Sequence, residues 1–127
     1  METRNQKPQE KIYTLLFPET QIISILTGTK TATGREPNNN NKNITINSKV
    51  YLRSSLQRPP AAVLRITNIK KSSIKDLNKQ DLKKLNYKTK KEYLKETFNK
   101  NLNINSIKNI YEFEVIENNI TKYINGY

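Results

Sequence analysis

Apolar residues occur in this sequence as short runs separated by polar segments, and the longest run, Ala61 to Leu64, has four residues. A helix that crosses a bilayer needs about 20 consecutive apolar residues, so the pattern excludes membrane-spanning helices and predicts no membrane partner. Short β-branched and aromatic runs bounded by turn residues are instead typical of strands in a small sheet. A chain of 127 residues is long enough for one core, which predicts a single domain over residues 12–127 after a flexible tail at residues 1–11.

The order of the predicted elements favours an α+β fold. A strand at residues 12–17 precedes a helix at residues 19–26, and further strands are expected at residues 44–46, 50–52, 61–69, 110–116 and 120–124. Asn78 with Asp81, and more faithfully Thr89 with Glu92, resemble capping boxes that begin two helices. Residues 28–36 are expected to form a polar turn, and the asparagine-rich residues 38–43 a surface loop without core residues. Because short polar turns join most strands, a small open β-barrel fits better than a doubly wound sheet.

Charge and composition narrow the classes of function. The chain has 23 Lys and Arg against 11 acidic residues, a formal net charge of +12 that lies entirely within residues 36–108, and this excess favours a polyanionic partner such as nucleic acid. Because His and Cys are absent, disulfides, Cys/His zinc sites and imidazole-based triads are excluded, and neither a metal nor another cofactor is predicted. The first residues lack the apolar core of a secretory signal, so we expect a cytoplasmic protein.

The segment QIISILTGTKTATGRE resembles the signature of ASCH domains, members of the PUA-like β-barrel superfamily, in which a helix ends in Gly-x-Lys-x-x-Thr-x-Arg. These places are filled here by Gly28, Lys30, Thr33 and Arg35. The segment SKVYLRSS, residues 61–101 and the segment IYEFEVI match later regions of the family in the same order. The resemblance implies a PUA-like open barrel with a motif helix, a helical insertion, and a cleft between the motif turn and that insertion.

Related PUA-like domains bind RNA, and the resemblance therefore implies that this chain binds RNA or another single-stranded nucleic acid in the basic cleft around Gly28 to Glu36. Lys30 and Arg35 suit phosphate, and the hydroxyls of Thr31 and Thr33 suit a base edge or a phosphate. Further candidates are two strand arginines and two tyrosines able to stack on unpaired bases: Arg53, Arg65, Tyr51 and Tyr87. For each of these residues the alternative is structural, as a solvated surface group or a half-buried part of the core.

Two other functions stay open. Bacterial acetylcytidine amidohydrolases are similar in motif and use its Lys and Thr with a Glu; Lys30 and Thr33 match, but Leu85 stands where the Glu is expected. The alternative is thus a hydrolase of a modified nucleoside, or a ribonuclease with candidates such as Tyr51 and Ser54, and the missing acid argues against the amidohydrolase. The third possibility is a basic accessory protein that binds another protein.

Overall fold

The structure is a computed structural model that describes residues 11–37, 41–95 and 103–125. Of the expected tail at residues 1–11, all but Lys11 lies outside these ranges. The elements within them follow in the order β1 (Ile12–Leu16), α1 (Glu19–Leu26), β2 (Ala32–Arg35), β3 (Lys49–Arg53), β4 (Ala62–Ser73), α2 (Lys79–Leu85), α3 (Lys90–Lys95), β5 (Ile107–Asn118) and α4 (Ile120–Asn125). None of these helices is long and apolar enough to cross a membrane.

The strands form one mixed sheet in the order β1-β3-β4-β5-β2. β1 runs parallel to β3, whereas the pairs β3–β4, β4–β5 and β5–β2 are antiparallel. Within the described residues no ladder joins the outer strands β1 and β2, so the sheet is not closed. The α+β class predicted from the sequence is confirmed, and of the expected open barrel the described residues show an open five-stranded sheet.

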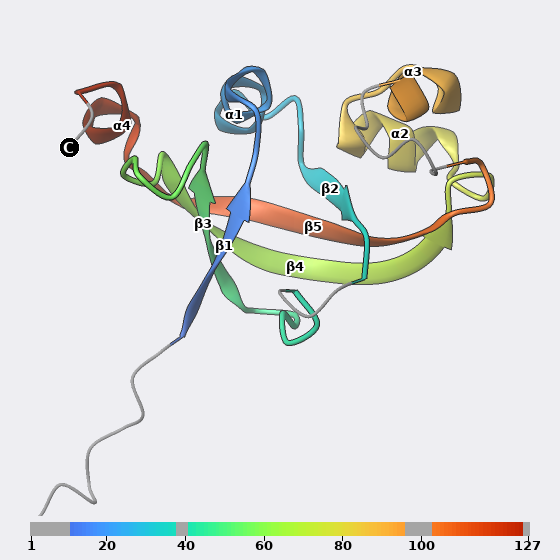
Figure 1. Ribbon diagram of the computed structural model, residues 1–127, viewed down its shortest axis with the longest axis horizontal. Helices are drawn as coiled ribbons and strands as arrows, with labels where there is room; N and C mark the ends of the chain where they lie inside the picture. The colour runs from blue at the N-terminus through green and yellow to red at the C-terminus, as the bar shows by residue number, and fades with distance from the viewer. Residues whose placement is uncertain (1–10, 38–40, 96–102, 126–127) are drawn as a thin grey trace, which may run out of the picture.

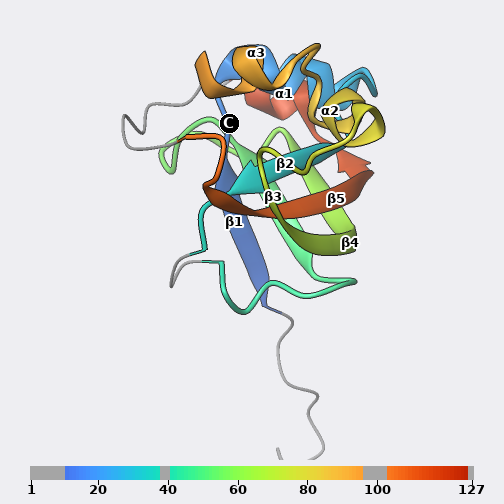
Figure 2. The same ribbon diagram turned by 90° about the vertical axis from the view of Figure 1, so that its right-hand side faces the viewer.

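The helices lie along one side of the sheet (Figures 1 and 2). α1 stands above the β1 end of the sheet, while α2 and α3 lie together at its other end (Figure 1). β4 and β5 are each 12 residues long and extend from the end of the sheet beneath α1 to the end beneath α2 and α3. Their register shifts after Val63 and after Ile66, and such bulges bend a strand, which allows the long pair to curve beneath the helices.

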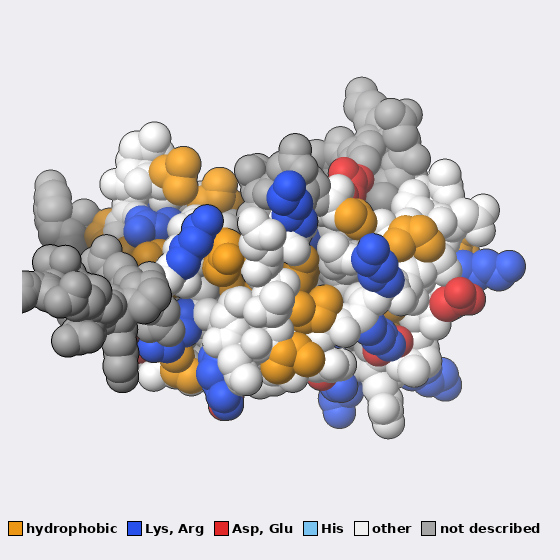
Figure 3. All heavy atoms as spheres, turned by 90° about the horizontal axis from the view of Figure 1, so that it is seen from below, with side chains coloured by type: hydrophobic (Ala, Val, Ile, Leu, Met, Phe, Trp, Pro, Cys, Tyr) orange, Lys and Arg blue, Asp and Glu red, His pale blue; other side chains and the backbone are white. Residues whose placement is uncertain are grey.

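On the opposite side of the sheet, charged side chains are scattered instead of clustered. Lys and Arg side chains are spread there among apolar and uncharged ones, with few Asp and Glu (Figure 3). Across β4 and β5, Arg65 and Glu114 oppose each other directly and form an ion pair. This face therefore shows no single concentrated basic patch.

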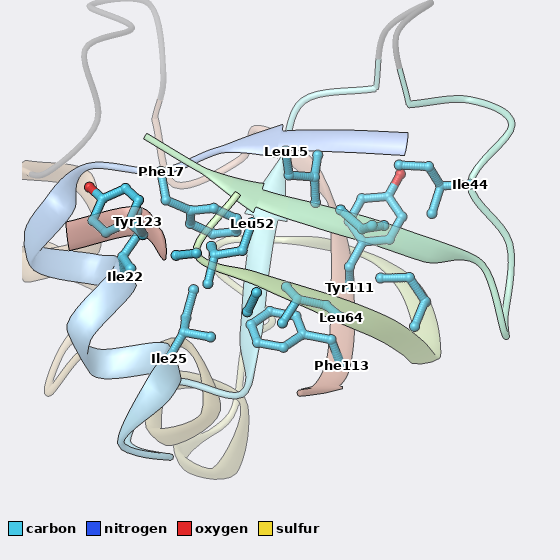
Figure 4. Packing of buried hydrophobic residues seen from close by; sticks show 14 residues of the cluster. Leu15, Phe17, Ile22, Ile25, Ile44, Leu52, Leu64, Tyr111, Phe113 and Tyr123 are labelled. Carbon is cyan, nitrogen blue, oxygen red and sulfur yellow. The ribbon is translucent and has the colours of Figure 1, made fainter. Parts of the chain in front are cut away.

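Buried apolar residues form two clusters on either side of β2. The larger cluster packs α1 against the sheet (Figure 4) and includes Leu15, Phe17, Ile22, Ile25, Leu52, Leu64 and Phe113. The smaller one packs α2 and α3 against β2 and β5, and contains Ala32, Ile74, Leu77, Leu82, Leu85, Tyr93 and Ile110. The segment with the sequence motif thus joins α1, which packs in the larger cluster, to β2, whose Ala32 belongs to the smaller one.

Three sequence expectations about the elements were wrong. Residues 28–36 are only partly a turn, because residues 32–35 pair with β5 as the short strand β2. Residues 44–46 form a turn instead of a strand, with Asn47 at φ 74° and its amide donating to the Ile66 carbonyl. Residues 120–124 lie in the helix α4, because helical spacing buries Tyr123 and keeps Ile120 against the larger cluster.

The two capping boxes differ in completeness, and the box at Thr89, which was expected to be the more faithful one, is the less complete. At α2 the Asn78 side chain accepts from the Asp81 amide at 2.8 Å, and the Asp81 carboxylate accepts from the Asn78 amide at 3.0 Å. At α3 the Thr89 hydroxyl accepts from the Glu92 amide, but Glu92 accepts from the amide of Lys88 instead of Thr89. The box at α2 is therefore the complete one.

The asparagine-rich segment has one core residue within its described part. Residues 38–40 lie outside the described ranges, but Asn41 is 4% exposed. Its side-chain amide donates to the Glu36 carbonyl at 3.2 Å, and its own carbonyl accepts from the Tyr111 hydroxyl at 3.3 Å. The expectation that this loop contributes nothing to the interior does not hold at Asn41.

Candidate nucleic-acid interface

The motif segment enters the sheet directly after α1. Gly28 has φ +87°, a value that residues with a Cβ rarely adopt, and it turns the chain out of the helix. The amides of Thr29 and Lys30 then donate to the Ser24 carbonyl, which keeps the turn against α1. From Ala32 the chain pairs with β5, so that Thr33 lies opposite Tyr111 and Arg35 opposite Asn109. Helix end, turn and strand are thus fixed by backbone hydrogen bonds.

A cavity of about 220 Å³, here named the motif cavity, opens beside this segment. It is bounded by the end of β1, by α1, β2 and β5, and by the α2–α3 connection. Its lining residues are Leu16, Pro18, Gln21, Lys30, Thr33, Gly34, Arg35, Tyr87, Tyr93 and Lys108. Three of the residues in this lining are cationic and none is acidic, so the potential in the cavity is positive.

Lys30 reaches the motif cavity from beneath α2. The residue is 3% exposed, its ammonium donates to the Leu85 carbonyl at 2.8 Å, and Nζ lies 5.3 Å from the centre of the Tyr87 ring. A cation over an aromatic face is held by the ring quadrupole. Leu85, which stands where related hydrolases have a Glu, therefore contributes a carbonyl to Lys30 and a buried side chain to the smaller cluster.

Arg35 is held by three neighbours at the mouth of the motif cavity. Its Nε donates to the Thr33 hydroxyl at 3.2 Å, its Nη2 donates to the Leu16 carbonyl at 2.8 Å, and its guanidinium lies 4.5 Å from the centre of the Phe17 ring. Burial lowers the pKa of Arg35, although nearby tyrosines oppose this. The group keeps its charge at neutral pH, as arginines in proteins do. Arg35 is thus a fixed cation with a preset orientation.

Two tyrosines form one wall of the motif cavity. The rings of Tyr87 and Tyr93 stack with centroids 4.8 Å apart and an angle of 8° between their planes. Tyr93 is 6% exposed, and its hydroxyl has no hydrogen-bond partner in the described structure. Burial raises the pKa of this hydroxyl, so it stays protonated at neutral pH. The hydroxyl occupies the space that a Cβ at Gly34 would need, which explains the glycine at this place of the motif segment.

Lys108 is a site residue that the sequence analysis missed. It lies on β5 opposite Ser72 at 6% exposure, and its ammonium has no hydrogen bond or ion pair with any residue in the described ranges. Burial lowers the pKa of its ammonium, the charge of Glu36 opposes this, and Arg35 adds to the lowering. A sequence signal did exist: because side chains two apart on a strand share a face, extending the alternation back from Ile110 puts Lys108 on the side of the smaller cluster.

A second cavity of about 360 Å³ adjoins the motif cavity and shares Leu16, Gly34, Arg35 and Lys108 with it. Glu36 and Asn41 line only this second cavity. The second cavity thus brings the Glu36 carboxylate into the same lining as Arg35 and Lys108.

The other candidate residues lie elsewhere. Thr31 is exposed and lines a different cavity together with Gly28 and Phe113. On β3 the Arg53 guanidinium lies 5.0 Å from the centre of the Tyr51 ring and donates to the Arg58 carbonyl at 2.8 Å. Arg65 pairs with Glu114 across β4 and β5.

The structure therefore brings Lys30, Thr33, Arg35 and Tyr87 together around one cavity and leaves Thr31, Tyr51, Arg53 and Arg65 outside its lining. In the described ranges, no group of three or more acidic residues is placed to hold a metal ion.

Comparisons with known proteins bear on the fold. No family model matches the sequence, and no curated protein matches it either. Among solved structures, protein EF3133 from Enterococcus faecalis V583, of the DUF984 family model, is similar with a TM-score of 0.69 at 12% identity, over 92% of this chain and 82% of its own. The ASCH domain from Lactobacillus crispatus JV V101 is similar with a TM-score of 0.66 at 12% identity, over 84% and 80% of the two chains.

The fold is that of ASCH domains. A mutant of the ASCH protein from Zymomonas mobilis also matches, with a TM-score of 0.54 at 9% identity, over 91% of this chain and 79% of its own. The ASCH resemblance stated from the Gly28–Arg35 motif is thereby confirmed at the level of the fold. At these identities the likeness concerns the fold alone, so the function has to be argued from the residues of the motif cavity.

Proposed function

We propose that this protein binds RNA, or another single-stranded nucleic acid, at the motif cavity. The observation that supports this function is the convergence of three cationic side chains, Lys30, Arg35 and Lys108, beside a stacked pair of tyrosines. Cationic groups bind phosphates, and aromatic rings contact unpaired bases, which together are the two requirements for holding a single strand. A duplex is disfavoured because its bases are not free to enter a cavity of this size.

Tyr87 lines a larger basic depression as well as the motif cavity. This depression of about 800 Å³ lies between the motif turn and the helices α2 and α3, and it is also lined by Lys79, Lys83 and Lys88. A strand with one nucleotide in the motif cavity thus has a basic surface along which its neighbouring phosphates can lie. Tyr87 and the ammonium of Lys30 would meet the bound base together, and the ammonium would donate to a base oxygen or nitrogen.

The test compares a motif cation with an outer lysine. Affinity for a short single-stranded RNA is measured over a range of salt concentrations for the unchanged protein and for Lys30→Met, Arg35→Ala and Lys91→Ala, the last of which changes an exposed residue of α3. We expect Lys30→Met and Arg35→Ala to weaken binding about tenfold or more, as losing a charged hydrogen bond does, and Lys91→Ala to have less than a twofold effect.

Thermal unfolding of each variant controls for damage to the fold. Equal losses in all three variants would mean that RNA senses only the net charge, and the motif cavity would no longer be the site. If no RNA binds at about 0.1 M salt, a basic protein with a protein partner becomes the better explanation.

A second function, hydrolysis of a modified nucleoside such as acetylcytidine, is favoured by the fact that Lys30 and Thr33 line the same cavity. The Thr33 hydroxyl accepts from Arg35, so its own proton remains to be donated. Against this function, the described lining of the motif cavity has no carboxylate to move a proton. The test is incubation with acetylcytidine and with single-stranded RNA, followed by product analysis. The hydrolase is rejected if the protein turns over neither substrate, or if the turnover persists in Lys30→Ala.

A further inference from the structure

Lys108 has a charge that the described structure does not neutralise by contact. The residue is 6% exposed, and no hydrogen bond or ion pair holds its ammonium within the described ranges. Burying an unpaired ammonium is costly, and proteins ordinarily pair such a group or leave it exposed. A largely buried lysine whose ammonium has no partner and which lines two cavities is a candidate contact for an anionic ligand.

The position of Lys108 shows where that anion would lie. Lys108 and Arg35 both line the motif cavity and the second cavity, so the two cations meet where the cavities join. Arg35 uses Nε and Nη2 for Thr33 and Leu16, which leaves its Nη1 side of the fork for a ligand. Gly34 also lines both cavities. A fixed guanidinium and an unpaired ammonium on one small space suit an oxyanion.

We propose that Arg35 and Lys108 bind a terminal phosphate group where the two cavities join, so that the ligand is a phosphomonoester, either a nucleoside monophosphate or the phosphorylated end of an RNA chain. The inference rests on the proposed function, whose site it makes more specific. A phosphomonoester has a charge between about −1.5 and −2 at pH 7, whereas a phosphate inside a chain has one negative charge. The doubly charged group is the better match for two adjacent cations, and Tyr87 lies on the same cavity to contact the attached base.

The first experiment varies the end of the RNA. Affinity is measured by fluorescence anisotropy for one short single-stranded RNA prepared with a 5′-phosphate, with a 3′-phosphate, and with hydroxyls at both ends. We expect one phosphorylated form to bind about tenfold or more tightly than the form without phosphate, which is the usual effect of a charged hydrogen bond. Equal affinity of all three forms would overturn the inference and leave RNA binding itself intact.

The second experiment assigns the preference to Lys108. Lys108→Met keeps a long apolar side chain without charge, and Lys71→Met is the control, because Lys71 is exposed on β4 directly opposite Asn109. We expect Lys108→Met to abolish the preference for the phosphorylated end and Lys71→Met to preserve it. A preference that survives in Lys108→Met would overturn the assignment.

Stability distinguishes a binding residue from a structural one. Since Lys108 is buried without a partner, replacing it by Met should raise the melting temperature by a few degrees. If Lys108→Met lowers the melting temperature and weakens all RNA forms alike, the residue supports the fold and the inference is wrong.

The last experiment distinguishes the two possible ligands, a nucleoside monophosphate and the phosphorylated end of an RNA chain. Calorimetry with the four common nucleoside 5′-monophosphates is compared with the matching nucleosides and with inorganic phosphate. Binding of a monophosphate that requires Lys108, without binding of RNA, would support the phosphomonoester site and refute RNA as the ligand. No binding of any RNA or monophosphate would refute both the inference and the proposed function.

Discussion

Gly34 and Tyr93 show how a single missing side chain shapes the site. A Cβ at Gly34 would overlap the Tyr93 hydroxyl and would lie 3.2 Å from its Cζ and 3.3 Å from Cδ1 of Ile110. The glycine thus allows α3 to bring its tyrosine against β2, where it stacks with Tyr87. The buried hydroxyl gains no hydrogen bond from this position within the described structure, so its presence there is costly for stability.

This arrangement predicts the outcome of a double-mutant cycle. Tyr93→Phe should raise the free energy of unfolding by about 1 kcal/mol, because it removes a buried polar group without a partner. Gly34→Ala should lower it by about 1 to 3 kcal/mol through overpacking, and by clearly less in the Tyr93→Phe background. Urea unfolding of the four proteins measures the coupling. Additive effects would mean that the hydroxyl and the glycine do not share this space.

At the residue scale the sequence predicted the part of the site that a motif describes. Lys30, Thr33 and Arg35 were expected together, and they line one cavity. Lys108 and Tyr93 were not expected as site residues: strand alternation puts Lys108 on the face of Ile110 but does not show that its ammonium lines a cavity, and a tyrosine on a helix face is ordinarily part of the core. Their burial depends on how β2 pairs with β5 and how α3 packs on both, which is a property of the tertiary structure.

At the scale of elements, α2 is the support of Lys30. The Leu85 carbonyl in the last turn of α2 accepts from the Lys30 ammonium, and the Lys84 carbonyl accepts from the Thr31 amide. Asn86 ends the helix in the left-handed conformation at φ 69°, which Asn tolerates better than most residues. The last turn of α2 therefore decides where the motif lysine lies.

The complete capping box at α2 predicts unequal effects of two cap substitutions. Asn78→Ala should lower the free energy of unfolding by about 1 kcal/mol, a usual cost of losing an N-cap. Thr89→Ala should cost less, because Glu92 accepts from Lys88 and leaves the Thr89 amide outside the box. Urea unfolding compares the two variants. A larger loss for Thr89→Ala would contradict this ranking.

Asp81, the other half of that box, predicts a pH dependence. Burial alone would raise the pKa of its carboxyl, but hydrogen bonds from the Lys70 ammonium and the Asn78 amide outweigh burial and lower the pKa. A lowered carboxyl pKa stabilises the fold above the ordinary value of about 3.9, and this contribution is lost as the pH falls through the folded-state pKa. Asp81→Asn should therefore be about 1 kcal/mol less stable at neutral pH, since Lys70 is partly exposed.

The check is urea unfolding of both proteins from neutral to acid pH. The difference between wild type and Asp81→Asn should shrink below about pH 4. A difference that stays constant into acid would mean that the carboxylate charge contributes nothing.

Elements with their own apolar pattern were predictable, and elements that depend on a partner strand were not. The helices α1 and α2 begin where capping and apolar spacing indicated. β2 was not predicted as a strand because Ala-Thr-Gly-Arg has no apolar alternation. It becomes a strand only through its ladder to β5. α4 was mistaken for a strand because its few isoleucines fit both periods in so short a segment.

At the scale of the whole molecule, the outer strands of the sheet approach each other without pairing. Arg35 on β2 donates to the Leu16 carbonyl at the end of β1. This side-chain hydrogen bond thus links the two strands that stand at opposite ends of the sheet order. Neither strand gains a second backbone ladder from the approach within the described ranges.

Arg35→Lys tests this link, because lysine keeps the charge but lacks the planar fork that reaches both Thr33 and Leu16. We expect faster hydrogen exchange at the amides of β1 and β2, while the long β4–β5 ladder keeps its protection. Mass spectrometry of peptic fragments measures both. A uniform rise across the sheet would show that Arg35 contributes to global stability instead of to this local link.

β1 and β2 are consecutive strands in the chain although they stand at the two ends of the sheet. Residues 17–31, which include α1, therefore connect one edge strand to the other (Figure 1). The length of this connection sets how far the two edges can stand apart. A longer segment in place of residues 17–31 would therefore loosen the constraint that keeps Leu16 within reach of Arg35.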